Sequence, residues 1–200
     1  MRFVHGAVPE DPDFHPEEEG WNAIREPDPI QMQIVALPVM LATAALLFVV
    51  IAKGTDVVWR DVAKYIGPAF VLMIPIHELI HAFANPRFGL TPRTYVGVWP
   101  SRLLFYAHYE GELPRERFLG ILIAPTLVLT VLPLLLCLVF RWNSSPLAAL
   151  ALANGLGAAG DLLGMIIVLR QIPRGTLVRN KGWRTYWRER VRDGSAAPSL

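Results

Sequence analysis

The sequence predicts an all-α membrane protein with about four transmembrane helices and a small β-hairpin between the second and third helices. Hydrophobic residues make up 53% of the 200 residues, and the mean hydropathy is +0.37, so the chain is more apolar than an ordinary soluble domain. The apolar residues are gathered in four long segments, at residues 30–52, 62–84, 118–140 and 147–169. Each is long enough for a helix to cross hydrocarbon, which takes roughly 20 residues, and a helix satisfies its own backbone there without water.

The two ends of the chain are polar and are expected to flank a transmembrane core at residues 30–170. Residues 1–29 form a proline-rich N-terminal tail without the basic start and apolar core of a secretory signal. Residues 171–200 form a basic C-terminal tail in which arginines are interspersed with tryptophan and tyrosine. This composition is typical of a segment lying on anionic lipid, so we expect the lipid bilayer as a partner and no nucleic acid. The single cysteine, Cys137, excludes a disulfide framework and a cysteine-rich metal site.

Basic residues are concentrated on one side of the predicted bundle. Four spans place the N-terminal tail, the 85–117 loop and the C-terminal tail on the same side. That side holds all of the 19 Lys and Arg residues except Lys53, Arg60, Lys64 and Arg141. The positive-inside rule therefore predicts a multi-pass protein of the cell membrane with both termini in the cytoplasm.

The 85–117 loop contains two stretches that alternate apolar and other side chains. They are RTYVGVW and LLFYAHY, and the turn-forming sequence WPSR joins them. This pattern predicts the β-hairpin, which we expect at the membrane surface.

Four polar residues lie well inside the apolar segments. Of the 17 acidic residues only Glu78 and Asp161 do so, and of the five histidines only His77 and His81. A charged group at the centre of a span costs about 2.5–3.5 kcal/mol on insertion scales, so such residues persist mainly where they have a function.

The second segment contains the motif HELIH at residues 77–81. Residues four apart on a helix lie one turn apart on the same face, so His77 and His81 can reach one Zn²⁺. Glu78 can then accept a proton from a water at the metal. Pro75 is expected to kink the helix and open space beside it. The alternative is a chance match with histidines hydrogen-bonded between helices, which leaves three costly residues in lipid without a role.

A catalytic zinc site needs a third protein ligand, and Asp161 is the other acidic residue inside the spans. Measured from the arginine that follows each span, at about 1.5 Å per residue, His77 and His81 lie roughly 15 and 9 Å deep and Asp161 roughly 14 Å deep. The three side chains are therefore expected at similar depth, nearer the cytoplasmic face. A helix-packing role for Asp161 is the alternative. His108 in the loop is a rival third ligand, although a surface histidine has many simpler roles.

The fourth segment carries NGLGAAGDLLG around Asp161. Gly160 and Gly164 form a small-xxx-small pair, which is expected to let this helix pack closely against another. Asn154 lies two turns before Asp161 on the same face. Its amide could hydrogen-bond a substrate carbonyl or an oxyanion, or it could equally link two helices.

HELIH on one span, with Asn154 and Asp161 on a later span, resembles the site-2 protease group of intramembrane zinc metalloproteases. It is especially similar to the small bacterial and archaeal membrane proteins of the zincin peptidase type, over roughly residues 20–170. Leu162 and Gly157 depart from the pattern, because site-2 proteases usually have Gly and Pro there. The resemblance implies that an edge strand of the hairpin pairs with an unwound substrate segment, although the hairpin could equally be a simple connection.

The motif, the third acid and the resemblance together predict an intramembrane zinc metalloendopeptidase. Its substrates would be membrane-embedded proteins or peptides, cleaved near the cytoplasmic face. His77, His81 and Asp161 are the expected zinc ligands and Glu78 the expected general base, with Asn154 as a candidate for binding substrate or oxyanion.

Other classes of protein share some of these features. A non-catalytic zinc-binding membrane scaffold has no need of Glu78. A metal transporter fits less well, because the outer halves of the second and fourth segments carry few polar residues apart from Lys64 and Asn154. A CAAX prenyl protease uses Glu as the third ligand, and no second glutamate lies inside the spans.

Overall fold

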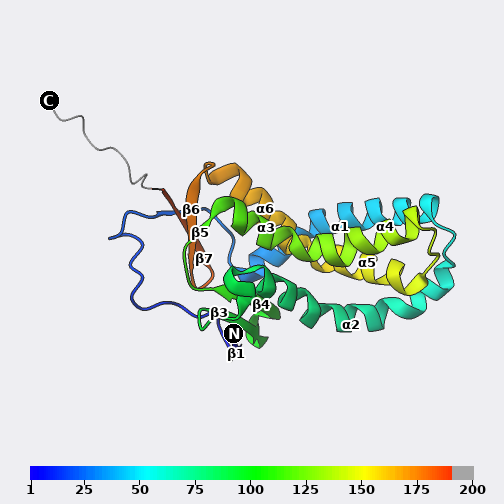
Figure 1. Cartoon of the computed structure of the whole chain (residues 1–200), viewed down its shortest axis with the longest axis horizontal. Helices are drawn as coiled ribbons and strands as arrows, with labels where there is room; N and C mark the ends of the chain where they lie inside the picture. Colours follow the sequence, from blue (N-terminus) through cyan, green and yellow to red (C-terminus); the bar gives the residue numbers. More distant parts are fainter. Residues whose placement is uncertain (191–200) are drawn as a thin grey trace.

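The computed structural model describes residues 1–190. Its helices run side by side along the long axis, and two small sheets gather at the end that also holds the N-terminus (Figure 1). Three helical segments are long and apolar enough to cross a membrane, and two further helices, bent by 49° at a short break, form a fourth if taken together. Three of the four predicted spans are therefore found as helical segments long enough to span a membrane, and the fourth corresponds to the pair of bent helices.

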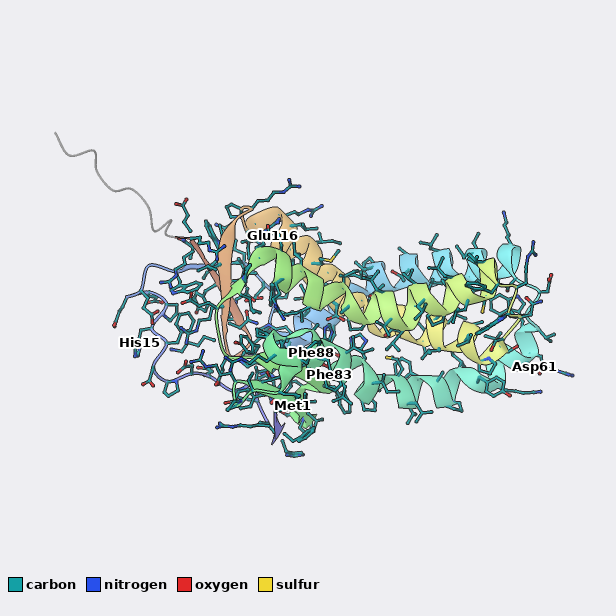
Figure 2. The ribbon with its side chains drawn as sticks, in the orientation of Figure 1. Met1, His15, Asp61, Phe83, Phe88 and Glu116 are labelled. Carbon is teal, nitrogen blue, oxygen red and sulfur yellow. The ribbon has the colours of Figure 1, made fainter. Side chains whose placement is uncertain are left out.

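The first two spans are single helices of 26 residues, α1 (Pro29–Gly54) and α2 (Trp59–Ala84). Asp28 caps the start of α1, and its side chain accepts hydrogen bonds from two backbone N–H groups of the first turn. Asp61, near the start of α2, lies at the end of the bundle away from the sheets, whereas His15 lies at the sheet end (Figure 2). α2 therefore runs toward the sheets and carries its HELIH motif close to them.

Each of the other two spans is irregular near its middle. The third consists of α3 (Arg115–Thr126), a π-helical turn (Leu127–Val131) and α4 (Leu132–Val139). The fourth consists of α5 (Ser145–Gly157) and α6 (Ala159–Gln171), with the bend between them.

α5 packs against both α1 and α2 through small residues. A Cβ added at Gly155 would lie 2.2 Å from Leu47 Cδ1 of α1, and one at Gly157 would lie 2.8 Å from Met73 Cε of α2. Four alanines of α5 are fully buried, namely Ala148, Ala149, Ala151 and Ala153. Small side chains let helix backbones approach closely in a membrane, so these residues set the spacing of the bundle.

Gly160 and Gly164 do not have the packing role that we predicted. Nothing lies within 4 Å of a Cβ added at either position, and both border the large cavity described below. The prediction was wrong because small-xxx-small spacing does not distinguish a helix contact from a surface that is left open.

The first sheet contains the predicted hairpin, which is confirmed. β3 (Thr94–Trp99) and β4 (Leu104–Tyr109) are antiparallel and joined by a 3-10 turn at Pro100–Arg102. β1 (Arg2–His5) pairs in parallel with β3, so the strand order is β1-β3-β4 and β4 is an edge strand. A second 3-10 turn, Pro86–Gly89, connects α2 to this sheet.

The second sheet was not predicted, so the all-α description is incomplete. Its order is β2-β7-β6-β5, with all neighbours antiparallel. The strands are β2 (Asn22–Ala23), β5 (Leu113–Pro114), β6 (Thr176–Lys181) and β7 (Arg184–Glu189). Both segments expected as tails therefore contribute strands; residues 191–200 of the C-terminal segment lie outside the described residues.

Candidate metal centre

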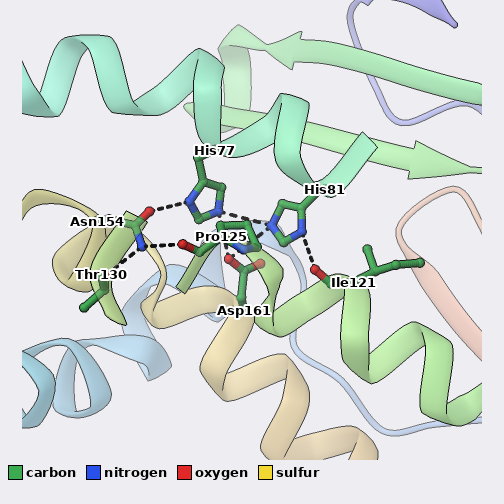
Figure 3. A network of polar contacts seen from close by, with 7 residues as sticks. All are labelled: His77, His81, Ile121, Pro125, Thr130, Asn154 and Asp161. Atoms are coloured by element: carbon green, nitrogen blue, oxygen red, sulfur yellow. Dashed lines mark hydrogen bonds and ion pairs between the residues drawn. The ribbon is translucent and has the colours of Figure 1, made fainter. Parts of the chain in front are cut away.

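α2 and the start of α6 bring three potential metal ligands together (Figure 3). His77 Nε2 lies 2.9 Å from Asp161 Oδ2 and 3.1 Å from His81 Nε2. The distance from His81 Nε2 to Asp161 Oδ2 is 3.3 Å. Both histidines are buried, and Asp161 sits in the first turn of α6, directly after the bend. The structure thus brings together the two histidines and the acid that were predicted as ligands.

A hydrogen bond behind His81 determines which of its ring nitrogens carries the proton. Nδ1 lies 2.8 Å from the backbone carbonyl oxygen of Ile121, which can only accept, so Nδ1 donates. This carbonyl is available because the residue four positions later in α3 is Pro125, which has no N–H to close the helical hydrogen bond. In the neutral ring, Nε2 of His81 therefore carries the lone pair and faces Asp161.

Asn154 fixes His77 in the same way. Its Nδ2 donates to the Pro125 carbonyl oxygen at 3.3 Å and to Thr130 Oγ1 at 2.9 Å. Its Oδ1 is therefore the atom that faces His77 Nδ1 at 2.8 Å, so the imidazole donates and its Nε2 carries the lone pair. Asn154 is fully buried, and both amide hydrogens are used within the fold. This geometry matches the helix-linking interpretation of Asn154.

The chemistry of this donor set fits a zinc ion. Two Nε2 lone pairs and a carboxylate oxygen converge on one point, which is unfavourable without a shared cation or added protons. Ligand atoms about 2.0–2.2 Å from a tetrahedral zinc are about 3.3–3.6 Å apart, slightly more than the separations of 2.9 to 3.3 Å here. Zinc-binding histidines commonly donate their other N–H to an oxygen, as both histidines do here.

A cavity of about 570 Å³ opens beside the three ligands. Glu78, which is partly exposed, lines it together with Ala107 of β4. The N–H of Glu110 donates to the carbonyl oxygen of Arg93, next to the last pair of β3 and β4. In an antiparallel pair, hydrogen-bonded and non-hydrogen-bonded residue pairs alternate. Ala107, three residues before Glu110, is therefore in a non-hydrogen-bonded pair, and its backbone N–H and C=O point away from β3. The unpaired edge of β4 therefore borders the same cavity as Glu78.

Part of the wall of this cavity is apolar and exposed. The exposed large apolar residues that line it come from α1, α2 and the hairpin: Leu37, Phe70, Leu103 and Phe105. α1 and α2 each pack against α5, and both helices line the cavity beside the metal centre.

The chain preceding α1 and the β6–β7 hairpin form another part of the cavity's wall. Trp183 Nε1 donates to the Pro27 carbonyl oxygen at 2.9 Å. The Glu26 carboxylate accepts from the backbone N–H of Thr185 at 2.6 Å and from its hydroxyl at 3.1 Å. Burial raises the pKa of Glu26, although the hydrogen bonds from Thr185 oppose this shift. We call residues 22–27 and the β6–β7 hairpin together the cap.

His108, the rival third ligand, is not a member of the metal-binding group of His77, His81 and Asp161. It lies on β4, is 5% exposed and borders the large cavity. Its Nε2 has no hydrogen-bond partner within residues 1–190, and burial lowers the pKa of His108 to about 4. His108 is therefore a buried neutral imidazole and not the surface histidine that the sequence indicated.

Apart from Asn154, the groups that orient the ligands were not among the predicted site residues. Ile121 acts through its backbone carbonyl, so its side chain carries no signal. Thr130, on the π-helical turn, accepts a hydrogen bond from Asn154, and its hydroxyl donates one to the Ala151 carbonyl oxygen. The available signal was Pro125, because a proline inside a span frees the carbonyl four residues earlier.

Comparison with protein families gives one finding. The family described as "putative zincin peptidase" matches residues 70–177, just over half of the chain. The matched region contains HELIH, Asn154 and Asp161. Neither the curated proteins nor the solved structures gave a match. A zincin is a zinc-dependent peptidase, and the donor set above is of the kind that zinc requires. The chain therefore belongs to this zincin peptidase family.

Proposed function

We propose that this protein is an intramembrane zinc metalloprotease that hydrolyses peptide bonds of membrane-embedded substrates near the cytoplasmic face. The observation that carries the proposal is the convergence of His77, His81 and Asp161 beside Glu78, on helices apolar enough to span a membrane. A structural role alone would not explain why two imidazole lone pairs and a carboxylate meet at one point.

The chain's own residues divide the chemical work among them. His77, His81 and Asp161 would hold the zinc, which when bound makes water a strong nucleophile at neutral pH. Glu78 would accept the proton of the attacking water and return it to the leaving amine, as a general base and then a general acid. Asn154 and the Ile121 carbonyl would keep both imidazoles in the tautomer that presents Nε2.

The cavity's lining supports a membrane-embedded substrate. Exposed apolar side chains of α1 and α2 line it, so a peptide could enter sideways from lipid between these helices. A peptide bond inside a helix is shielded by its neighbours, so the substrate must unwind at the site. The free edge of β4 offers hydrogen bonds to such an extended segment beside Glu78.

The second candidate is a non-catalytic zinc-binding scaffold, which the same metal centre also supports. The two differ at Glu78, because a scaffold needs the metal and the packing but no base. Glu78 borders the cavity and is not used in any ion pair within residues 1–190. This placement favours the protease.

The test compares three proteins: wild type, Glu78→Gln and Asp161→Ala. Each is purified for zinc analysis and co-expressed with a tagged single-span reporter. We expect wild type to carry about one zinc per chain and to cleave, and Glu78→Gln to keep zinc but lose cleavage by about 10²–10⁴-fold. Asp161→Ala should lose most of the zinc. Equal cleavage by zinc-loaded wild type and Glu78→Gln would refute the protease and leave the scaffold.

A further inference from the structure

Four large apolar residues outside the spans are strongly exposed. Within residues 1–190, Phe3, Phe88, Leu90 and Leu103 are between 70% and 85% exposed, and no large apolar residue of the spans is as exposed. We call these four residues the apolar ridge. Exposed apolar side chains gathered in one region mark a contact with another molecule or with a membrane.

The ridge residues come from three segments that meet at the first sheet. Phe88 and Leu90 belong to the turn after α2, Phe3 to β1, and Leu103 to the turn between β3 and β4. The backbone nitrogen of Met1 donates to the carbonyl oxygen of Thr91 at 2.8 Å, which holds the start of β1 against the turn after α2. Figure 2 shows Met1 and Phe88 in the same part of the molecule.

One face of the first sheet continues the ridge. Phe3 pairs with Val96, and both His5 and Phe105 pair with Val98 two residues further along. Because side chains alternate between the two faces of a strand, these five side chains share one face, and four of them are apolar. The sheet therefore presents apolar side chains between the start of β1 and the hairpin turn.

The ridge also continues the exposed apolar surface of α2. Val71 and Leu72 in the middle of this span and Phe83 in its last turn are exposed, and Phe88 follows Phe83 by only five residues. The apolar surface that faces lipid along the span therefore extends past its end, onto the turn and the sheet.

The basic residues around the ridge have no acidic partner. No residue from 79 to 109 is acidic, and Arg2, Arg87 and Arg93 are exposed. Neither these three nor Arg102 of the hairpin turn takes part in an ion pair within residues 1–190. Unpaired arginines beside an apolar surface suit the headgroup region of anionic lipid, where the charge meets phosphate and the apolar side chains meet acyl chains.

Two ridge residues hold an uncommon backbone conformation. Phe88 and Leu103 have φ of 54° and 49°, in the left-handed region. Bulky residues are rare there, and glycine fits this conformation better. The exposed side chain at each position therefore has a conformational cost, which burial in lipid would offset.

We propose that the first sheet and the turn after α2 are inserted into the lipid leaflet at which α2 ends, with the apolar ridge among the acyl chains and the flanking arginines at anionic headgroups. This arrangement holds β4, and the cavity that it lines, within the leaflet. The inference requires the membrane spans, but it depends on neither zinc nor proteolysis.

Spin labels measure the depth of the ridge directly. Cys137→Ala removes the native thiol, and Phe3→Cys, Phe88→Cys or Leu103→Cys then supplies a single labelling site in the full chain, which is reconstituted into vesicles of phosphatidylcholine and phosphatidylglycerol. Depth follows from power saturation with oxygen, which enters lipid, and with a water-soluble nickel chelate. We expect all three labels about 5–10 Å into the boundary between headgroups and acyl chains.

Two further labels calibrate the depth. Val71→Cys, in the middle of α2, should lie deeper, and Glu18→Cys, in an exposed part of the N-terminal segment, should lie in water. In vesicles of phosphatidylcholine alone, the ridge labels should move outward while the Val71→Cys label does not, because the anionic headgroups are missing. Thermal unfolding is measured for every variant, and the ridge labels lie on separate segments, so two can carry the test if one fails to fold.

The outcomes are distinct. Ridge labels as accessible to nickel as the label of Glu18→Cys would refute the insertion. Labels shielded from both oxygen and nickel would show that protein, such as a second copy of the chain, covers the ridge, and would refute it as well. Equal depth in the two kinds of vesicle would refute the role of the arginines in binding anionic lipid.

Discussion

At the scale of single residues, the metal centre depends on hydrogen bonds made on the side of each histidine away from the metal. Asn154 accepts from His77 Nδ1, and its own amide is anchored to Pro125 and Thr130. The geometry uses every hydrogen of that amide, so an oxyanion role would require these bonds to break. We therefore regard Asn154 as a positioning residue.

Replacing Asn154 by Ala should weaken zinc binding without abolishing it. The imidazole of His77 would lose the oxygen that fixes its orientation, and loss of such a partner typically lowers metal affinity about 10–100-fold. The measurement is competition for zinc with a chelator of known affinity. Asn143→Ala, in an exposed turn, is the matched control. Unchanged affinity in Asn154→Ala would contradict the positioning role.

At the scale of helices, Pro125 links an irregular stretch of the third span to the metal centre. Its missing N–H frees the Ile121 carbonyl, its own carbonyl accepts from Asn154, and the π-helical turn begins two residues later. π-Helical turns inside α-helices are frequent at functional sites, where they redirect backbone groups. Both ligand histidines are thus oriented by one region of the third span.

Pro125→Ala should reduce zinc affinity by restoring an N–H that competes for the Ile121 carbonyl. His81 Nδ1 would then share its acceptor, so we expect a drop of up to about tenfold in the same competition assay. Helix content by circular dichroism should not fall, because alanine is the better helix former. Full zinc affinity with a more regular helix would show that the proline is not needed.

Gly160 and Gly164 of α6 leave open space in the large cavity. A larger side chain at either position should therefore block part of the cavity. A leucine at either position has room to be accommodated, so folding and zinc content should stay near wild type. Cleavage of the membrane reporter should fall by at least about tenfold, because the side chain occupies space proposed for substrate. Gly157→Leu is the contrasting variant, since a Cβ there meets Met73 at 2.8 Å and should destabilise the fold. Unimpaired cleavage by both α6 variants would place the substrate elsewhere.

The sequence predicts those elements whose signal is local. Hydropathy located the spans to within a few residues, alternation located the β3–β4 hairpin, and helical spacing placed His77 and His81 on one face. The second sheet escaped prediction because β2 has two residues and its partner β7 lies more than 150 residues later. β6 and β7 did carry a signal, an Asn-Lys-Gly turn with Gly182 at φ 55°, but their arginines suggested a lipid-facing tail.

At the scale of the whole molecule, the two sheets lie at one end of the bundle (Figure 1), and His77 and His81 lie in the part of α2 that precedes the first sheet in the chain. Under the proposed orientation this end faces the cytoplasm, where both termini, the hairpin and the cap would meet the basic side of the membrane. The 141–146 turn would lie on the opposite side.

Reporter fusions test this orientation. A reporter that is active only in the cytoplasm should be active at either terminus and inactive at the 141–146 turn, and a reporter active only outside should give the reverse. Expression is checked by immunoblot for each fusion. A C-terminus on the outer side would overturn the proposed orientation and the cytoplasmic location of cleavage.

The pairing of β2 with β7 has a consequence for biosynthesis. Asn22 of β2 can pair with Trp187 of β7 only after Trp187 has been synthesised, whereas the last candidate metal ligand, Asp161, is synthesised earlier. A growing chain therefore possesses all three candidate zinc ligands before it possesses the β6–β7 hairpin that forms part of the cavity's wall. A chain that stops short of residue 184 would carry a metal centre whose cap cannot form.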